Sequence, residues 1–129
     1  MKESEIIDAF ISSGKIKGEF KREFSVGYFF LPETADKYED YDKHLNKAYR
    51  VFLKQIDLLV ENEEEVWIIE CKDRINPASV GQLLLYKFLY EKDHPKEERA
   101  IKLGILYVHK DRLVEAYCRS NQIHLFEIS

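Results

Sequence analysis

The 129-residue chain has few cysteines, no long apolar run and no excess of basic residues. Its two cysteines, Cys71 and Cys118, form no C-x-x-C pair, and its four histidines lack metal-ligand spacing, which argues against a zinc or iron–sulfur site. No apolar run approaches the roughly 20 residues that span a bilayer. The opening MKESE does not have the pattern of a signal peptide. We therefore expect a cytoplasmic protein (in a host cell if its source is viral) with no membrane partner.

The net charge of −4 is unlike that of a dedicated nucleic-acid-binding module, which is usually basic. It does not argue against a metal-dependent nuclease, because a site that binds divalent cations is itself acidic. With 45% hydrophobic and 34% charged residues, the composition is typical of a globular protein rather than a disordered one. The length predicts a single domain over residues 1–129.

The most informative stretch is Gln55–Tyr86. Asp57 lies inside an apolar strand pattern, where an ionised carboxylate is costly unless something compensates it. A second apolar run ends in Glu70-Cys71-Lys72, and strand alternation puts Glu70 and Lys72 on one face and Cys71 on the other. If the two runs pair as a hairpin, two carboxylates and an ammonium group converge at the end of a sheet. Oxygen ligands at close range suit a hard cation such as Mg²⁺.

The order of Asp57 and then Glu70-x-Lys72 on the next strand resembles the signature of the PD-(D/E)XK nuclease superfamily, which has the restriction-endonuclease-like fold. Gln82-x-x-x-Tyr86 on the following helix is similar to the extra motif of its RecB-like and Cas4-like branch. The cluster cysteines of Cas4-like nucleases are absent. The resemblance implies a nuclease that depends on Mg²⁺ or Mn²⁺ and has DNA as its partner. It leaves open whether the enzyme is an endonuclease or an exonuclease.

The resemblance also implies roles for individual residues. Asp57 and Glu70 would bind the metal ion, with the backbone carbonyl of Cys71 as a further ligand. Lys72 would position the attacking water and stabilise charge that develops on the phosphate. Two more residues complete the implied catalytic set: Gln82, which would orient Lys72 or a metal-bound water, and Tyr86, which would support its helix or touch the DNA strand.

Three acidic residues near the N-terminus are candidates for an additional ligand. Glu3 shares the apolar face of a helix expected over residues 3–13, ending at Gly14. This resembles the first helix of archaeal-type Holliday-junction resolvases, which carries an early glutamate that faces the site. Glu3 can equally complement the positive end of its helix. Glu19 and Glu23 are alternative ligands, but they alternate with apolar residues in a strand or hairpin expected over 16–30, on a face that favours solvent.

Hydrophobic periodicity predicts the remaining elements. We expect strands over 49–61, 66–72, 101–108 and 122–128, a helix over 77–93 and a second over 111–119 with Leu113, Val114 and Tyr117 inward. The order α-β-β-β-α-β-α-β predicts a three-layer α/β sandwich around a mixed sheet, in agreement with the restriction-endonuclease-like core. The polar connection over 32–47 has a length typical of a lid or a mobile loop.

The helix over 77–93 carries more apolar residues than one contact with a sheet requires. Leu85, Leu89 and Tyr90 are therefore candidates for a homodimer interface through this helix, which a junction resolvase needs to cut two strands symmetrically. A rival interpretation is a catalytically inactive nuclease-fold module that acts in nucleic-acid or protein binding. A third treats Glu70 and Lys72 as a surface ion pair worth only about 0–1 kcal/mol. That interpretation leaves Asp57 in its apolar strand unexplained.

Overall fold

The computed structural model describes residues 1–31 and 53–129, which form an α/β fold with one five-stranded mixed sheet and three helices. The helices are α1 (Glu3–Ser13), α4 (Pro77–Asp93) and α5 (Arg112–Ser120), together with one 3₁₀ turn, η1 (Tyr28–Phe30). The strands are β1 (Glu19–Val26), β2 (Lys54–Glu61), β3 (Glu65–Arg74), β4 (Ala100–His109) and β5 (Ile123–Glu127). The order of helices and strands is the one that the periodicity predicted.

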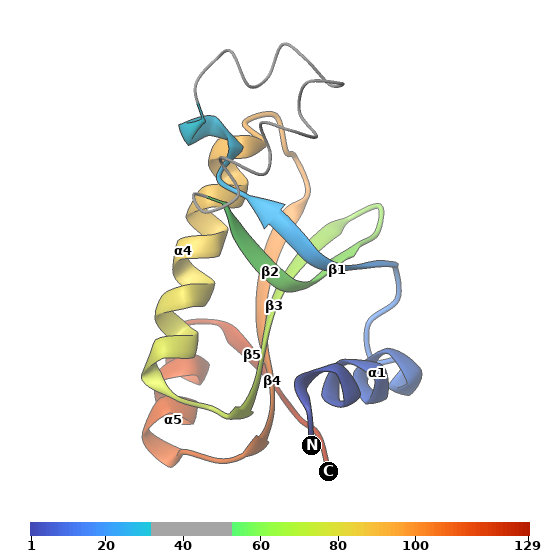
Figure 1. The fold of residues 1–129 in the computed structure, drawn as a ribbon, viewed down its shortest axis with the longest axis vertical. Helices are drawn as coiled ribbons and strands as arrows, with labels where there is room; N and C mark the ends of the chain where they lie inside the picture. The colour runs from blue at the N-terminus through green and yellow to red at the C-terminus, as the bar shows by residue number, and fades with distance from the viewer. Residues whose placement is uncertain (32–52) are drawn as a thin grey trace.

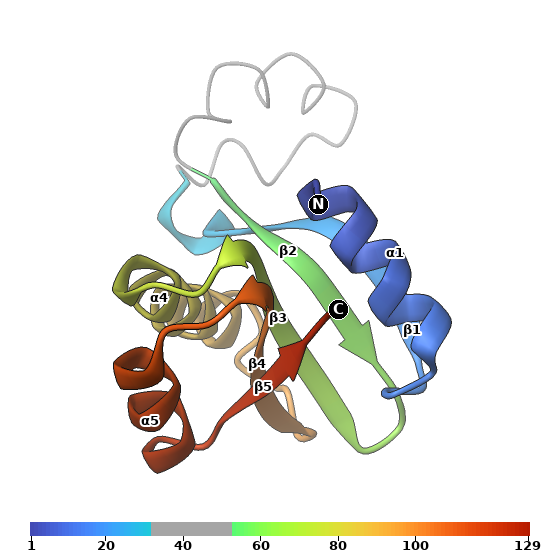
Figure 2. The same ribbon diagram turned by 90° about the horizontal axis from the view of Figure 1, so that it is seen from below.

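The five strands lie side by side in chain order. β1, β2 and β3 pair antiparallel, whereas β4 and β5 run parallel to β3 because α4 and α5 carry the chain back between successive strands. Figure 2 shows α1 on one side of the sheet and α4 and α5 on the other. The expected mixed sheet with helices between its parallel strands is thus confirmed.

Each face of the sheet packs its own apolar cluster. On the α1 side, Ile6 and Phe10 pack with strand residues such as Ile69, and on the α4 side Leu83 packs with residues such as Ile68. Every residue of β3 from Val66 to Cys71 is buried, because this central strand is covered on both faces. Burial of each large apolar side chain stabilises the fold by about 1.5–3 kcal/mol. β3 is therefore a rigid support for the residues at its carboxyl end.

The ends of α4 follow the sequence signals closely. Asn76 caps the helix, and its side chain accepts a hydrogen bond from the N–H of Ser79 at 2.9 Å. Pro77 occupies the first turn, where its missing N–H costs nothing. The helix ends at Asp93, before the His94-Pro95 pair, as predicted.

The strand or hairpin expected over 16–30 is wrong at both ends, because β1 covers only Glu19–Val26. β1 ends at Val26 because Gly27 adopts φ 108°, a left-handed conformation that turns the chain. The carboxylate of Asp93 then accepts hydrogen bonds from the N–H groups of Gly27 at 2.8 Å and Phe29 at 3.0 Å. Asp93 is far along the chain from β1, and its two hydrogen bonds hold Tyr28–Phe30 as η1.

The expected alternation of β1 also fails at one point. Phe20 packs against the α1-side cluster and Phe24 against the α4-side cluster, although a strict period of two places them on one face. Glu23, between them, has φ 51°, which rotates the strand. β2 makes the same change, since Leu58 belongs to the α1-side cluster and Ile56 to the α4-side cluster.

The inward face of α5 differs from the expectation. Val114 is buried as predicted, but Leu113 is 84% exposed and Tyr117 is 50% exposed. Cys118, four residues after Val114, takes the inward position instead. In α4, Leu89 and Tyr90 lie in the core rather than on a free surface, whereas Leu85 is 44% exposed. The surplus apolar surface of α4 is therefore narrower than the sequence indicated.

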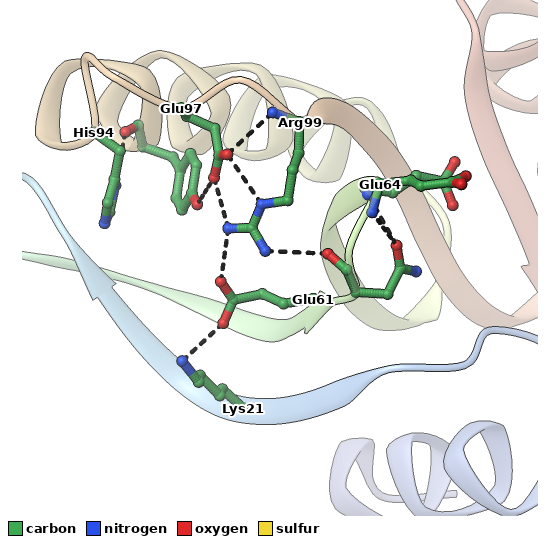
Figure 3. Close-up of polar contacts among 9 residues, drawn as sticks. Lys21, Glu61, Glu64, His94, Glu97 and Arg99 are labelled. Carbon is green, nitrogen blue, oxygen red and sulfur yellow. Dashed lines mark hydrogen bonds and ion pairs between the residues drawn. The ribbon is translucent and has the colours of Figure 1, made fainter.

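Arg99 joins the end of the sheet where β1 and β2 meet the β2–β3 turn (Figure 3). Its guanidinium donates to Glu97 at 2.7 Å, to Glu61 at 3.0 Å and to the carbonyl of Asn62 at 3.2 Å. Glu61 is also paired with Lys21 of β1 at 2.7 Å. The network fixes β1, β2 and the start of β4 to one another at this end.

Some expectations concern residues outside the described part of the chain. They are the polar connection over 32–47 and the first residues of the strand expected from Tyr49. Among the helices that the structure describes, none has the length and apolarity needed to cross a membrane.

Candidate active site

β2 and β3 separate where each strand carries a carboxylate. Their ladder ends at the Leu58–Ile69 pair, and the next positions along the two strands are Asp57 and Glu70. There the Oδ2 atom of Asp57 accepts a hydrogen bond from the backbone N–H of Cys71 at 2.8 Å. This bond takes the place of a ladder bond between the strands. It also supplies part of the compensation that a carboxylate in an apolar strand requires.

Of the acidic residues that the structure describes, Glu70 has the pKa that is shifted furthest from its usual value. Its side chain is directed to the α4 face and the residue is only 3% exposed. Burial, followed by the adjacent carboxylate of Asp57, raises the pKa of Glu70 well above its usual range. The charge of Lys72 partly offsets this increase in pKa. Among the described residues, the Oε2 atom of Glu70 is buried without a hydrogen-bond partner.

Lys72 lies on the same face of β3 as Glu70 and is half-buried. Within the described residues it forms no ion pair with either carboxylate at 4.0 Å or less. Its charge nevertheless lowers the pKa of Glu70 and that of Cys71, so the ammonium group acts on both. Lys72 is therefore close to the carboxylates without being neutralised by direct contact.

α4 brings Tyr86 to the groove, whereas no contact joins Gln82 to the acidic pair among the described residues. Tyr86 is buried, and burial followed by the charges of Glu70 and Asp57 raises its pKa to about 12. Its hydroxyl therefore stays protonated at neutral pH and can donate a hydrogen bond. Gln82, one helical turn earlier, is half-buried, and its Oε1 atom has no hydrogen-bond partner in the part of the chain that the structure describes. Two buried acceptors, on Glu70 and Gln82, are thus unsatisfied.

Cys71 connects the site to α1. Its thiol lies 3.6 Å from the backbone carbonyl of Glu3, and burial followed by the charge of Glu3 raises the pKa of Cys71 to about 12. The carbonyl of Cys71 is directed to the same side of β3 as its N–H, which is the side of Asp57. The Glu3 side chain is exposed, but its charge contributes to raising the pKa of Glu70. The charge of Glu3 therefore acts on Glu70 from the edge of the site.

An open groove of about 620 Å³ leads to Asp57 and Tyr86 between the start of β2 and α4. The other residues that line the groove are Glu23, Ser25, Leu53, Lys54 and Gln55. Sequence reasoning missed the last four, because strand residues of these types carry no chemical signature.

Glu23 was weighed and expected to face solvent, and it is exposed. It also lies opposite Asp57 in the register, between the pairs Arg22–Leu58 and Phe24–Ile56. Glu19, in contrast, pairs with Glu61 at the other end of β1, away from the groove.

The oxygen atoms around Asp57 and Glu70 are donors of the kind that a divalent cation needs. Within residues 1–31 and 53–129, no three His, Cys, Asp or Glu side chains form a group that could hold a metal ion. Asp57 and Glu70 offer two carboxylates, and the Cys71 carbonyl offers a third oxygen. This set fits Mg²⁺, which usually takes one or two carboxylates and completes its shell with water and substrate phosphate.

No family model, curated protein or solved structure matches this chain. The residues around Asp57 nevertheless form a candidate active site. It has a buried glutamate beside a half-buried aspartate, a nearby ammonium group and a groove that opens to solvent.

Replacement of Glu70 by glutamine should stabilise the protein in metal-free buffer, increasingly so above pH 4.5. The pKa of Glu70 is raised from 4.5 in the fold, so the stability that the protonated group contributes is complete below that pH. It is lost as the pH rises toward the folded-state pKa, at no more than about 1.4 kcal/mol per pH unit. Urea unfolding between pH 4 and 8 measures the slope. Glu63→Gln, on the exposed turn between β2 and β3, is the matched control, and equal slopes for Glu70→Gln and wild type would contradict the prediction.

Proposed function

We propose that this protein is a divalent-metal-dependent nuclease that hydrolyses phosphodiester bonds of DNA. The observation that carries the proposal is the meeting of Asp57 and Glu70 where β2 and β3 separate. A strand pair that stays hydrogen-bonded would have no room for a ligand between two such side chains. The buried Oε2 atom of Glu70, which has no hydrogen-bond partner among residues 1–31 and 53–129, adds support, because a buried carboxylate oxygen requires a proton, a donor or a cation.

The arrangement of the strands supports a restriction-endonuclease-like fold for this proposal. Three antiparallel strands follow α1, and α4 then leads into a strand parallel to β3. The helices on opposite sides of the sheet support the three-layer sandwich that the element order predicted (Figure 2). In this layout the pair Asp57–Glu70 lies at the carboxyl end of the central strand.

Asp57, Glu70 and the Cys71 carbonyl would hold the Mg²⁺ or Mn²⁺ ion. When bound, the ion would neutralise charge on the scissile phosphate and lower the pKa of a coordinated water. Lys72 forms no ion pair with the described residues, so it could hold the attacking water and stabilise the extra negative charge on phosphorus. Asp57 is fixed for its task by the N–H of Cys71, which limits rotation of the carboxylate.

Gln82 and Tyr86 of α4 would act on the metal site that Asp57 and Glu70 form. Gln82 has a carbonyl oxygen that is bonded by none of the described residues and could accept a hydrogen bond from Lys72 or from a bound water. Tyr86 carries a neutral hydroxyl on the wall of the groove, where it can donate to a phosphate oxygen. Both act as positioning residues in this proposal.

A crystal soaked in MnCl₂ tests the site directly. We expect an ion between Asp57 and Glu70, with metal–oxygen distances near those of octahedral Mg²⁺ sites, about 2.0–2.1 Å. The same protein should cleave duplex, single-stranded or junction DNA in Mg²⁺ or Mn²⁺ and be inactive in EDTA. An ion bound elsewhere, together with no cleavage of any of these DNAs, would refute the proposal.

The second candidate function is a catalytically inactive module of the same fold that acts in binding or assembly. An apolar groove of about 360 Å³ between α4 and α5 favours it. Leu84, Leu113 and Tyr117 line this groove and are well exposed. An apolar surface of this kind is typical of a contact with another macromolecule. The module would retain Asp57, Glu70 and Lys72 without turnover.

We expect a homodimer through the outer face of α4, where exposed apolar residues lie, whichever form of DNA the site cuts. Because Leu89 and Tyr90 are buried, the contact would use Leu84 and Leu85, which are 46% and 44% exposed. Size-exclusion chromatography with light scattering should give twice the mass of one chain. Leu85→Glu should yield the monomer, while Glu91→Gln, on the same helix, should not. A monomeric wild type at micromolar concentration would remove the dimeric version and leave the site chemistry untouched.

A further inference from the structure

η1 presents three consecutive aromatic residues at the surface. Tyr28 is 42% exposed, Phe29 is 39% exposed and Phe30 is 63% exposed. Phe88 of α4, beside them, is 42% exposed. Single exposed aromatic residues need no explanation, but a group of four on one surface is typical of a binding site.

The aromatic residues of η1 are held in place. Both carboxylate oxygens of Asp93 accept backbone hydrogen bonds at η1, from Gly27 and from Phe29. The rings of Phe29 and Phe30 have centroids 3.8 Å apart, and Phe29 meets the ring of Phe88 edge-on at 6.2 Å. A surface fixed in this way binds a flat ligand without first losing conformational entropy.

The aromatic group continues the groove that contains Asp57. Ser25 is a wall of this groove, and the chain reaches Tyr28 three residues later. Lys54, another wall, pairs with Val26 at the end of β1. In Figure 1, η1 lies beside the end of α4 and next to the start of β2. A strand lying in the groove would therefore pass from Asp57 along Lys54 to η1.

Two lysines flank this path. Lys54 is exposed at the wall of the groove, and the ammonium group of Lys92 lies 5.7 Å from the centre of the Phe88 ring. Cations beside aromatic rings match a ligand that carries both phosphates and flat bases. A protein partner would have no particular need for that combination.

We propose that Tyr28, Phe29 and Phe30 form a stacking platform for unpaired bases, which directs the site to single-stranded DNA. This inference rests on the proposed nuclease function. Bases of a duplex are stacked on one another and cannot lie on a protein ring, whereas every unpaired base can. Lys54 and Lys92 take the backbone phosphates, and Asp93 is a positioning residue that keeps η1 in its binding shape.

Binding can be measured apart from cleavage, by fluorescence anisotropy in EDTA with a labelled oligodeoxythymidine about 12 nucleotides long. We expect the single strand to bind at least tenfold more tightly than a duplex of the same length. Phe30→Ala should weaken binding by roughly 5- to 150-fold, the usual effect of losing one base–aromatic stack. Phe30→Trp should retain binding and Phe30→Leu should not, because leucine keeps the apolar surface but cannot stack.

His124→Ala, on β5, is the matched control, since it removes an exposed ring that does not line the groove and should leave binding unchanged. Asp93→Ala should weaken binding although all three aromatic residues remain. Equal affinity for duplex and single strand, no binding of either, or no loss in Phe30→Ala would overturn the platform. A dimer that Phe30→Ala dissociates would assign the surface to a second copy instead. Failure of the nuclease proposal has a different signature: single strands bind but are not cut in Mg²⁺ or Mn²⁺.

Discussion

Lys72→Ala should reduce DNA cleavage in Mg²⁺ to background, a loss of at least about 10²- to 10³-fold in kcat. The ammonium group of Lys72 acts on Glu70 through its charge but forms no ion pair with it at 4.0 Å or less within the described residues. It is therefore available for the charge that develops on the phosphate only in the transition state. Single-turnover cleavage of labelled DNA, with circular dichroism to confirm folding, measures the effect.

The matched control is Lys110→Ala, which removes an exposed lysine paired with Glu127 and should leave kcat unchanged. Glu70→Ala should lose binding of Mn²⁺ as well as cleavage, which separates the metal ligand from Lys72. Wild-type kcat in Lys72→Ala would remove this residue from the mechanism. A wild type that cuts no DNA would instead favour the inactive binding module.

Arg99→Ala should lower the free energy of unfolding at pH 7 by about 2–4 kcal/mol. The substitution removes the guanidinium from Glu97, Glu61 and the Asn62 carbonyl together. The side chains of Glu97 and Glu61 are only 12% and 18% exposed, so water replaces these bonds incompletely. Urea unfolding followed by circular dichroism gives the value. Lys110→Ala, which breaks an exposed pair, should cost no more than about 1 kcal/mol.

The same network makes the effect of Arg99→Ala depend on pH. The hydrogen bonds from Arg99 lower the pKa of Glu97 from 4.5 to about 2. A lowered pKa contributes stability that is complete above pH 4.5 and is lost as the pH falls toward 2. The difference between wild type and Arg99→Ala should therefore be smaller at pH 3 than at pH 7. A difference that stays constant across this range would show that Glu97 does not gain its stability from Arg99.

Local signals in the sequence were sufficient for most of the helix and strand assignments. The Asn76-Pro77 start and the His94-Pro95 stop of α4 act through the backbone of adjacent residues, so they work in any tertiary setting. The apolar runs of β3 and β4 likewise predicted buried central strands. The inward face of α5 was wrong because the stripes Leu113–Tyr117 and Val114–Cys118 are adjacent, and only the orientation of the helix on the sheet chooses between them.

Strand alternation in the sequence placed Glu70 and Lys72 together and a hairpin brought Asp57 near them, whereas Gln82 and Tyr86 were named by the resemblance to the nuclease superfamily. Only the tertiary structure decided how they meet. The hydrogen bond from the N–H of Cys71 to Asp57 joins β3 to β2 beyond the end of their ladder, and the path of η1 depends on Asp93, far along the chain. The burial that raises the pKa of Glu70 comes from packing on both faces of β3. Such bonds and packing join residues distant in sequence, so no local pattern encodes them.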